Sequence, residues 1–388
     1  MYPTITDFLQ KTFGIYIPLP IQTYGFFFAL ALLTAAYLYY LEYKRKEQEG
    51  KFIPFYIEEI EGKAPNLKFI LWNFIFALLI GYKLIDALLN YGEFVENPQA
   101  VILSARGNFV GGLLVGIIYS AYIYWKKNKA KLPKPKVVYK ETYPRQIVGN
   151  MFVVVGIAGI LGAKIFDVIQ PQNFKGFLQD PLGSLLSFSG LTFYGGIIGG
   201  FAAGVWYVKK YNINLIHSLD SLAPAAAIGY GIGRIGCHVS GDGCWGVVNT
   251  APKPQWLQII PNWAWSYDYP NNVINEHLEY PVFPTSFYEM LMMFIAFAIL
   301  WSLRKKIKIP GMLFAIYLLL SGIERFVIEF IRVTNRYNIF GLKLSQAQII
   351  SIILFSIGTT MLIMMFLKKE KFYEFGKTQI KPINIPQK

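Results

Sequence analysis

The stretch IVGNMFVVVGIAGILGAKIFDVI, residues 147–169, decides the fold class of this chain. It is apolar apart from Asn150, Lys164 and Asp167. A helix needs about 20 mainly apolar residues to cross a bilayer, where every backbone polar group must be satisfied within the helix. The stretch therefore predicts a membrane-spanning helix.

Eight further segments have a similar apolar character, and the segment 216–235 is the weakest because it is rich in Ala and Gly and polar at both ends. The sequence thus predicts an all-α, polytopic membrane protein with about nine transmembrane helices, in one membrane domain over residues 1–388. The expected spans are residues 21–40, 69–89, 109–125, 147–169, 191–208, 216–235, 287–301, 311–331 and 347–366.

The composition of the whole chain agrees with this class. Of its 388 residues, 54% are hydrophobic, 17% aromatic and only 15% charged, whereas a soluble domain carries about 25% charged residues. The first 20 residues hold one base, Lys11, and no small-residue cleavage site. We therefore expect the first apolar segment to stay as a span and not to be removed as a signal peptide.

The basic residues behind the net charge of +14 cluster at the ends of apolar segments, where topology signals lie, so they do not indicate a nucleic-acid partner. The loops after the first, third, fifth, seventh and ninth segments are rich in Lys and Arg, while the other loops carry single bases such as Arg106 and Lys253. The positive-inside rule then predicts the N-terminus outside and the C-terminus, with a tail at 368–388, inside.

Two loops have distinct compositions. Residues 237–285, on the predicted outer side, are rich in aromatic residues and prolines, which indicates a small folded extracytoplasmic cap and not a disordered loop. Residues 126–144, on the inner side, are rich in Lys and Pro. We expect them to form a solvated linker whose bases contact anionic headgroups.

Residues 69–125 form a helical hairpin that resembles residues 147–208. GYKLIDAL at 81–88 aligns with GAKIFDVI at 162–169, and FVGGLLVG at 109–116 aligns with FYGGIIGG at 193–200. These matches in the same order favour duplication over shared composition. Tyr194 stands where the first copy has Val110, so we expect the second copy to be the functional one.

SGIERFVIEFIR, residues 321–332, places ionisable side chains inside a predicted span. Arg325, Glu329 and Arg332 have the i, i+4, i+7 spacing of one helix face. An ionisable group within a span costs about 2.5–3.5 kcal/mol on insertion scales and usually faces a cavity, a partner or a substrate. A functional stripe is therefore favoured over a buried structural ion pair.

Arg234 ends the sixth predicted span in GYGIGRIGCHVSGDGCWG, residues 229–246. The glycines around it let a ligand come close, and the guanidinium fork suits a phosphate, although snorkelling to the interface is the alternative. Glu289 opens the seventh span, where the helix dipole alone accounts for a carboxylate. Asp220 either caps a helix or pairs with Lys164.

The chain has only two cysteines, Cys237 and Cys244, which excludes a disulfide framework and a four-thiolate zinc site. With His238 and Asp242 they lie within eight residues, but the spacing fits no common zinc pattern, so we expect no metal. A disulfide and two buried free thiols remain equally open. The adjacent side chains of Cys237 and His238 diverge, which disfavours a catalytic pair.

Six of these stretches, in this order, resemble the prolipoprotein diacylglyceryl transferase family. The resemblance covers about residues 20–40 and 147–367, and residues 69–125 look like an addition to the usual seven-helix form. The matching motifs are PIQTYGFFFALAL at 20–32, GAKIFDV at 162–168, GLTFYGGIIGG at 190–200, the signature at 229–246, VFPTSFYE at 282–289, and RFVIEFIR at 325–332 with QIISI at 348–352.

The resemblance implies an enzyme at the outer face of the bacterial inner membrane. Such an enzyme moves the diacylglyceryl group of phosphatidylglycerol onto the lipobox cysteine of a prolipoprotein, and glycerol phosphate leaves. The implied partners are phosphatidylglycerol, prolipoprotein signal peptides and membrane lipids, with no cofactor and no nucleic acid.

The site residues follow position by position from the same resemblance. Arg234 and Arg325 match arginines expected to hold the lipid phosphate. Asp242 takes the acidic position of the signature, although GDGCWG has one residue more than the common form, and Asp220 matches an aspartate before an Ala-Pro pair. The expected catalytic residues are Arg234, Arg325, Tyr194, Asp242 and Glu329, and the expected substrate-binding residues are Arg234, Arg325, Arg332, Gly195, Gly196, Glu289, His238 and Asp220.

The chain also departs from the family pattern. Tyr194 stands where members commonly have histidine, Cys237 where they have asparagine, and Ser321 where they have tyrosine. Tyrosine is a poorer base than histidine at neutral pH. The general base therefore stays open among Tyr194, His238 and Asp242.

Two other functions remain in competition. The altered Tyr194 and Ser321 positions favour a lipid-binding or lipid-scrambling protein that has lost the chemistry, whereas the retained Arg234 and Arg325 oppose it. The repeat and the charged groups within spans suggest a secondary transporter. A transporter should place its glycine-broken helix at the membrane midplane, whereas GRIGC, residues 233–237, lies near the predicted outer surface.

Overall fold

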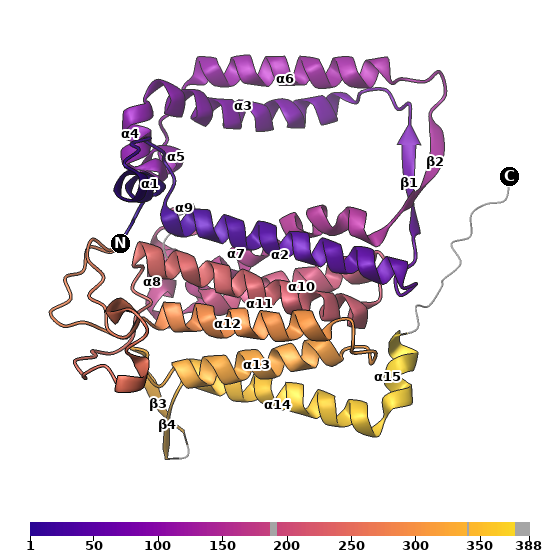
Figure 1. Cartoon of the computed structure of the whole chain (residues 1–388). Helices are drawn as coiled ribbons and strands as arrows, with labels where there is room; N and C mark the ends of the chain where they lie inside the picture. Colours follow the sequence, from indigo (N-terminus) through magenta and orange to yellow (C-terminus); the bar gives the residue numbers. More distant parts are fainter. Residues whose placement is uncertain (187–191, 340, 377–388) are drawn as a thin grey trace.

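The computed structural model describes residues 1–186, 192–339 and 341–376. Over these residues, nine long helices run roughly along one direction and alternate in polarity (Figure 1). Each corresponds to one predicted segment. They are α2 (Thr23–Gln48), α3 (Leu67–Leu89), α6 (Phe109–Lys129), α7 (Val148–Ile169), α10 (Phe193–Lys210), α11 (Leu215–Ser240), α12 (Thr285–Leu303), α13 (Met312–Ile328) and α14 (Gln346–Leu367).

Six of these helices, α2, α3, α6, α7, α12 and α14, are long and apolar enough to cross a membrane. The chain is therefore a mostly helical, multi-pass membrane protein. The other three long helices are shorter or less apolar, as for α13 with its 17 residues, and the total of nine spans stays a prediction. Apolar side chains such as Leu33, Ile118 and Phe366 are about two-thirds exposed, as expected of a surface that meets lipid.

Shorter helices lie at the ends of the long ones. The α-helices among them are α1 (Ile5–Phe13), α4 (Tyr91–Glu96), α5 (Pro98–Leu103), α8 (Pro171–Gln179), α9 (Pro181–Leu186) and α15 (Lys369–Gly376). The 3₁₀ turns are η1 (Pro144–Ile147), η2 (Gln255–Leu257) and η3 (Asn262–Ala264). Helix α15 begins the predicted tail, and the rest of that tail, residues 377–388, lies outside the described residues.

The prediction of an all-α fold was wrong in one respect, because two small antiparallel ribbons are present. Strand β1 (Phe55–Glu61) pairs with β2 (Lys136–Thr142), and β3 (Arg336–Ile339) pairs with β4 (Leu342–Ser345). Strand β2 lies in the loop expected to be a solvated linker. Its KVVYKET sequence faces the acidic FYIEEIE of β1, with Glu61 opposite Lys136, and such cross-strand charge pairs stabilise a ribbon.

The helices form two groups. Helices α2, α7, α10, α11, α12, α13 and α14 make one bundle, in which α11 packs against α2, α12 and α13. Helices α3 and α6 pack against each other and lie apart from the bundle, to which the β1–β2 ribbon connects them (Figure 1).

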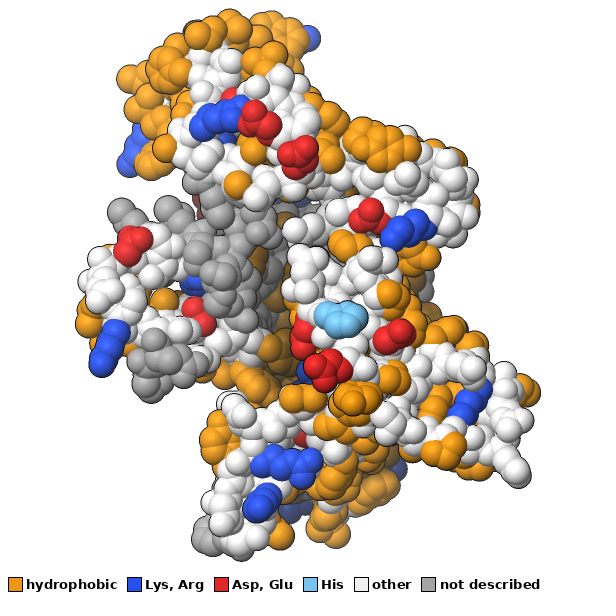
Figure 2. Space-filling view, turned by 90° about the vertical axis from the view of Figure 1, so that its left-hand side faces the viewer, with side chains coloured by type: hydrophobic (Ala, Val, Ile, Leu, Met, Phe, Trp, Pro, Cys, Tyr) orange, Lys and Arg blue, Asp and Glu red, His pale blue; other side chains and the backbone are white. Residues whose placement is uncertain are grey.

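One end of the bundle carries a folded segment, residues 241–284, which we call the cap (Figure 1). The side chains of Trp245, Tyr269 and Val282 are buried together at its centre, with Met1 packed against them. The opposite end of the bundle carries α15, and we call it the tail end. Figure 2 looks onto the cap end, where charged side chains of both signs are scattered between hydrophobic ones.

Glycines allow close contact within both hairpins. A Cβ on Gly162 of α7 would lie 2.4 Å from the Gly195 carbonyl oxygen of α10, and one on Gly195 would lie 2.5 Å from the Gly162 carbonyl oxygen. In the other hairpin, the aligned glycines are Gly81 and Gly111. The space at their Cβ positions is occupied by the side chains of Val115 and Ile85 from the facing helix. Both predicted copies therefore pack their helices through matching positions.

Replacing Gly162 should destabilise the protein because the new methyl group meets backbone, which cannot move aside. We expect Gly162→Ala to lower the free energy of unfolding by about 1–3 kcal/mol, measured as the thermal unfolding midpoint in detergent. Gly149→Ala, on the same helix with nothing within 4 Å of its Cβ position, should be neutral or stabilise by up to about 1 kcal/mol. Equal shifts in both variants would contradict this account of the α7–α10 contact.

Candidate active site

Three arginines converge on one buried carboxylate at the cap end of the bundle. The Glu289 side chain has no exposed surface. Its Oε1 accepts hydrogen bonds from Nη1 of Arg325 at 2.8 Å and Nη1 of Arg332 at 3.0 Å. Arg234 Nε lies 3.0 Å from Oε2 as an ion pair that is not aligned as a hydrogen bond. We call Glu289 and these three residues the arginine cluster.

The alternating direction of the helices brings these residues together. Arg234 lies near the C-terminal end of α11, Glu289 in the first turns of α12, and Arg325 near the C-terminal end of α13, so all three lie at the cap end. Arg332 follows α13, where Ile331 accepts a backbone hydrogen bond from Val247 and Arg332 forms a bridge with Gly246. Residues far apart in sequence are thereby fixed around one point.

The glycines beside Arg234 mainly serve helix packing. A Cβ on Gly231 would lie 2.5 Å from the Phe294 ring on α12, and one on Gly236 would lie 2.9 Å from Phe27 Cβ on α2. Only Gly233 among these three has open space at that position. The prediction that these glycines let a ligand approach therefore fits Gly233 and not the other two.

The arginine cluster keeps polar groups available to a ligand. Glu329 lies 3.2 Å from Nη2 of Arg325, yet neither of its carboxylate oxygens accepts a hydrogen bond from the described residues, and Arg332 Nε donates none to them. The three guanidiniums exceed the two carboxylates ion-paired with them, Glu289 and Glu329, by one positive charge. A buried donor without a partner, such as Arg332 Nε, is rare. Together with the excess positive charge, it suits an anion such as a phosphodiester.

Tyr194, at the start of α10, lies beside the arginine cluster. Its hydroxyl hydrogen-bonds with Arg325 and is close enough to Glu329 and Arg332 to be affected by their charges. Gly195 is buried against Gly162 of α7, and the Cβ position of Gly196 contacts Gly159 and Ala163 of the same helix. These two glycines, expected at the substrate, therefore position α10, while Tyr194 reaches the site.

Asp242 belongs to a second group, together with the two cysteines. One ligand-type atom from each of Cys237, Asp242 and Cys244 lies within 4.8 Å of the others, a proximity that the spacing did not indicate. Both cysteines are free thiols. The hydrogen bond from Cys237 lowers the pKa of the Cys244 thiol. Arg234 joins the two groups, because its Nη1 lies 3.8 Å from the Cys237 sulfur.

His238 points away from both groups. Its Nδ1 lies 3.1 Å from the Tyr269 hydroxyl, and its ring packs among those of Trp263, Tyr267 and Phe287. The neighbouring residues Cys237 and His238 thus diverge, as expected for adjacent positions on a helix. His238 anchors the cap to α11.

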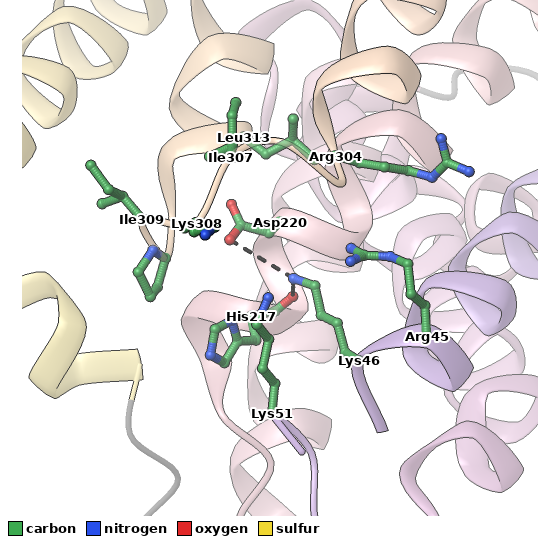
Figure 3. Close-up of a pocket in the computed structure, with 11 residues that line it drawn as sticks. Arg45, Lys46, Lys51, His217, Asp220, Arg304, Ile307, Lys308, Ile309 and Leu313 are labelled. Carbon is green, nitrogen blue, oxygen red and sulfur yellow. Dashed lines mark hydrogen bonds and ion pairs between the residues drawn. The ribbon is translucent and has the colours of Figure 1, made fainter. Parts of the chain in front are cut away.

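Asp220 lies at the tail end, 14 positions before Arg234 on α11, which corresponds to about 21 Å along a helix. Its carboxylate accepts hydrogen bonds from the backbone N–H groups of Gly311 and Phe314 at the start of α13 and lies 3.8 Å from Lys46. The first of the two predicted roles, a helix cap, is correct, and the ion-pair partner is Lys46. Asp220, Lys46 and the buried His217 line a pocket at this end (Figure 3).

Sequence reasoning missed the main role of Glu289, which is to neutralise and align the arginines. It also missed Tyr230, whose hydroxyl accepts a hydrogen bond from Arg234 at 2.9 Å and lies 3.4 Å from Glu289, and the buried Glu324 close to the same charges. The sequence did contain a signal for this role of Glu289. Three arginines predicted at one membrane face need a buried acid nearby, and Glu289 begins the adjoining helix.

Comparison with known proteins assigns the chain to a family. The profile of the family described as prolipoprotein diacylglyceryl transferase matches residues 136–364, a range that includes the whole arginine cluster. The chain belongs to the prolipoprotein diacylglyceryl transferase family. It is therefore a membrane transferase of lipoprotein biosynthesis. Helices α2, α3 and α6 lie outside the range matched by this family profile.

Individual members of the prolipoprotein diacylglyceryl transferase family support this assignment. The phosphatidylglycerol–prolipoprotein diacylglyceryl transferase of Clostridium tetani is 32% identical over 247 residues, which cover 63% of this chain and 88% of that protein. The enzyme of the same name from Chlorobaculum tepidum is 27% identical, with coverage of 69% and 89%. That from Vibrio parahaemolyticus is 28% identical, with coverage of 69% and 88%.

Removing the charge of Glu289 should destabilise this transferase strongly, because three largely enclosed guanidiniums, 12–23% exposed, lose the counter-ion that they share. We expect Glu289→Gln to lower the free energy of unfolding by on the order of 3 kcal/mol, measured by titration with a denaturing detergent. Glu279→Gln in the cap, an exposed glutamate, should change it by less than about 0.5 kcal/mol. Full stability of Glu289→Gln would show that the arginines do not depend on this carboxylate.

Proposed function

We propose that this chain transfers the diacylglyceryl group of phosphatidylglycerol to the thiol of the lipobox cysteine of a prolipoprotein. The observation that carries the proposal is the convergence of Arg234, Arg325 and Arg332 on Glu289 at the cap end. Family membership gives the reaction class. The arginine cluster provides a site for the anionic headgroup of the lipid.

In the proposed reaction the sulfur of the acceptor cysteine attacks the glyceryl carbon that carries the phosphate. The new C–S bond is a thioether, the C–O bond to the phosphate breaks, and its electron pair leaves with glycerol phosphate. The thiol proton must be removed, because the thiolate is the nucleophile. The reaction thus needs a cationic site for the leaving group and a means of ionising the thiol.

The arginines supply the first requirement. A phosphodiester carries one negative charge, and the departing glycerol phosphate gains a second as the C–O bond breaks. Guanidinium groups held in place before the reaction stabilise this developing charge more than they stabilise the bound lipid, which is what lowers a barrier. The hydrogen bonds of Arg325 and Arg332 to Glu289 fix their orientation and leave other N–H groups for the phosphate.

The proposal includes a topology of nine spans with the N-terminus and the cap outside, in the bacterial inner membrane. The basic ends of α2, α6, α10 and α12 lie with α15 at the tail end (Figure 1). Lys126, Lys127, Lys209 and Lys210 in this group suit the cytoplasmic side. The arginine cluster then lies near the outer headgroup layer, where the acceptor is presented.

A lipid-binding protein without transferase chemistry is the second candidate, and Tyr194 in place of the family's usual histidine favours it. Incubation of the protein with phosphatidylglycerol and a lipobox peptide separates the two. The mass of one diacylglyceryl group added to the peptide supports the transferase. An unmodified peptide with lipid bound to the protein supports the alternative.

The arginine cluster provides the sharpest test of the transferase. We expect Arg234→Ala and Arg325→Ala each to lower the transfer rate by about 10²–10³, the size of effect seen when one donor to a developing oxyanion is lost. The matched control is Arg106→Ala, because Arg106 lies partly exposed beside α3 and pairs with Asp86 and Glu93 away from the cluster. Transfer at the wild-type rate in the Arg234 and Arg325 variants would overturn the proposed phosphate site.

Tyr194→Phe tests whether the tyrosine is the general base. As a hydrogen-bonding neighbour of Arg325, its hydroxyl contributes on the order of 1 kcal/mol, so we expect transfer to fall by less than about tenfold. Loss of a general base costs about 10²–10⁴ and would also change the pH profile of the rate. A hundredfold loss with a shifted pH profile would therefore identify Tyr194 as the base.

A further inference from the structure

We infer that Cys237, Asp242 and Cys244 bind a zinc-like divalent cation, and that this ion takes the acceptor thiol as its fourth ligand. The inference rests on the proposed function for the identity of the acceptor. The binding of the ion itself rests on the geometry of the three side chains, which we call the thiol site.

The distances fit such an ion. Tetrahedral zinc, with Zn–S of about 2.3 Å and Zn–O of about 2.1 Å, places neighbouring ligand atoms about 3.6–3.8 Å apart. The donor atoms of the thiol site already lie within 4.8 Å of one another. They need to move by about an ångström or less to coordinate zinc. Two thiolates with one carboxylate are a donor set that favours zinc over magnesium or calcium.

The backbone holds these donors in place. Helix α11 ends at Ser240 and is capped by Gly241. Both Gly241 (φ 67°) and Gly243 (φ 86°) adopt left-handed conformations that turn the chain back on itself. Cys244 thereby returns to the side of Cys237.

Hydrogen bonds around the thiol site then fix its ligands. The backbone N–H of Cys244 donates to Asp242 Oδ1 at 3.1 Å, and Thr285 Oγ1 donates to the Cys244 carbonyl at 2.8 Å. Of the two Asp242 carboxylate oxygens, only Oδ1 accepts a hydrogen bond from the described residues, which leaves Oδ2 for an ion. Supporting contacts of this kind orient metal ligands in proteins.

The charge balance also fits. Two thiolates, one carboxylate and a divalent ion carry a net charge of −1. Arg234, with Nη1 at 3.8 Å from the Cys237 sulfur, offsets that charge. The same guanidinium lies 3.0 Å from Glu289, so one side chain adjoins both the thiol site and the proposed phosphate site.

Three protein ligands leave one position of a tetrahedral ion for a ligand from outside, as in catalytic zinc sites. A thiol that coordinates zinc loses its proton outright. The acceptor cysteine would bind as a thiolate, with its proton released to water, next to the arginines that hold the leaving phosphate. Such a site removes the need for a strong base, which agrees with the tyrosine at position 194.

Cobalt(II) provides a direct test that does not depend on transfer activity. The full-length protein, purified in detergent, reduced and treated with a chelator, is titrated with Co²⁺. We expect one ion per chain with the visible spectrum of a tetrahedral site and a near-ultraviolet thiolate-to-cobalt band of two thiolates. Absence of this band from the reduced protein overturns the inference. The same holds if the protein is purified with the two cysteines in a disulfide and binds no cobalt after the disulfide is reduced.

Variants assign the ligands. Cys237→Ser and Cys244→Ser should each halve the thiolate band, and Asp242→Asn should weaken cobalt binding by about tenfold or more. The matched control is Asp268→Asn, because Asp268 is an exposed acid of the same cap, and it should bind cobalt as the wild type does. Equal losses in Asp242→Asn and Asp268→Asn would overturn the assignment of Asp242.

The fourth ligand is tested with the same protein and a lipobox peptide. Addition of the peptide should raise the thiolate band by about half, since a third thiolate joins two, while a peptide with serine in place of the cysteine should leave it unchanged. No rise with the cysteine peptide overturns the role of the ion in binding the acceptor. A rise in a protein that transfers no diacylglyceryl group would instead overturn the proposed function and leave the thiol site standing.

Discussion

The ionic contact between Glu289 and three arginines is the interaction on which the organisation of the bundle depends. An arginine withdrawn from water without a counter-ion is among the most costly groups that a protein can contain. Here three arginines, each 12–23% exposed, come from two helices and the segment after the second. Glu289 lowers that cost for all three at once. Helices α11, α12 and α13 are thereby held to a single arrangement, since any sliding of α12 would separate the carboxylate from its partners.

The same contact explains why the site is polar and still rigid. Tyr230 and the backbone pairing of Val247 with Ile331 hold the guanidiniums from other directions. Glu329 and Arg332 keep atoms without partners among the described residues. A site that is fixed by some of its hydrogen-bonding groups and left open in others can bind an anionic headgroup without first reorganising.

Much of the fold could be predicted because a membrane restricts the chain to long apolar helices. Each of the nine predicted segments corresponds to a helix, with ends that differ by a few residues, as at α2, which continues to Gln48 beyond the predicted 40. The β1–β2 ribbon was missed because its strands lie outside the apolar segments and about 75 residues apart. Short polar strands pair through partners that a local pattern does not show.

The candidate site was predicted in part for a similar reason. Arg325, Glu329 and Arg332 share a helix face, so their spacing alone indicated a stripe. The contact of Arg234 with Glu289, and the return of Cys244 to the side of Cys237, depend on how separate segments pack and on two left-handed glycines. The placement of Asp220 at the far end of α11 follows from simple helix length, which a motif match does not take into account.

The β1–β2 ribbon also bears on how the α3–α6 hairpin is attached. Strand β1 precedes α3, strand β2 follows α6, and the two pair along their whole length from Phe55 with Thr142 to Glu61 with Lys136. The chain therefore leaves the bundle and re-enters it at neighbouring points. A segment with such a closed base forms a separate module of the chain, because the helices on either side of it keep the same order and the same path with or without it.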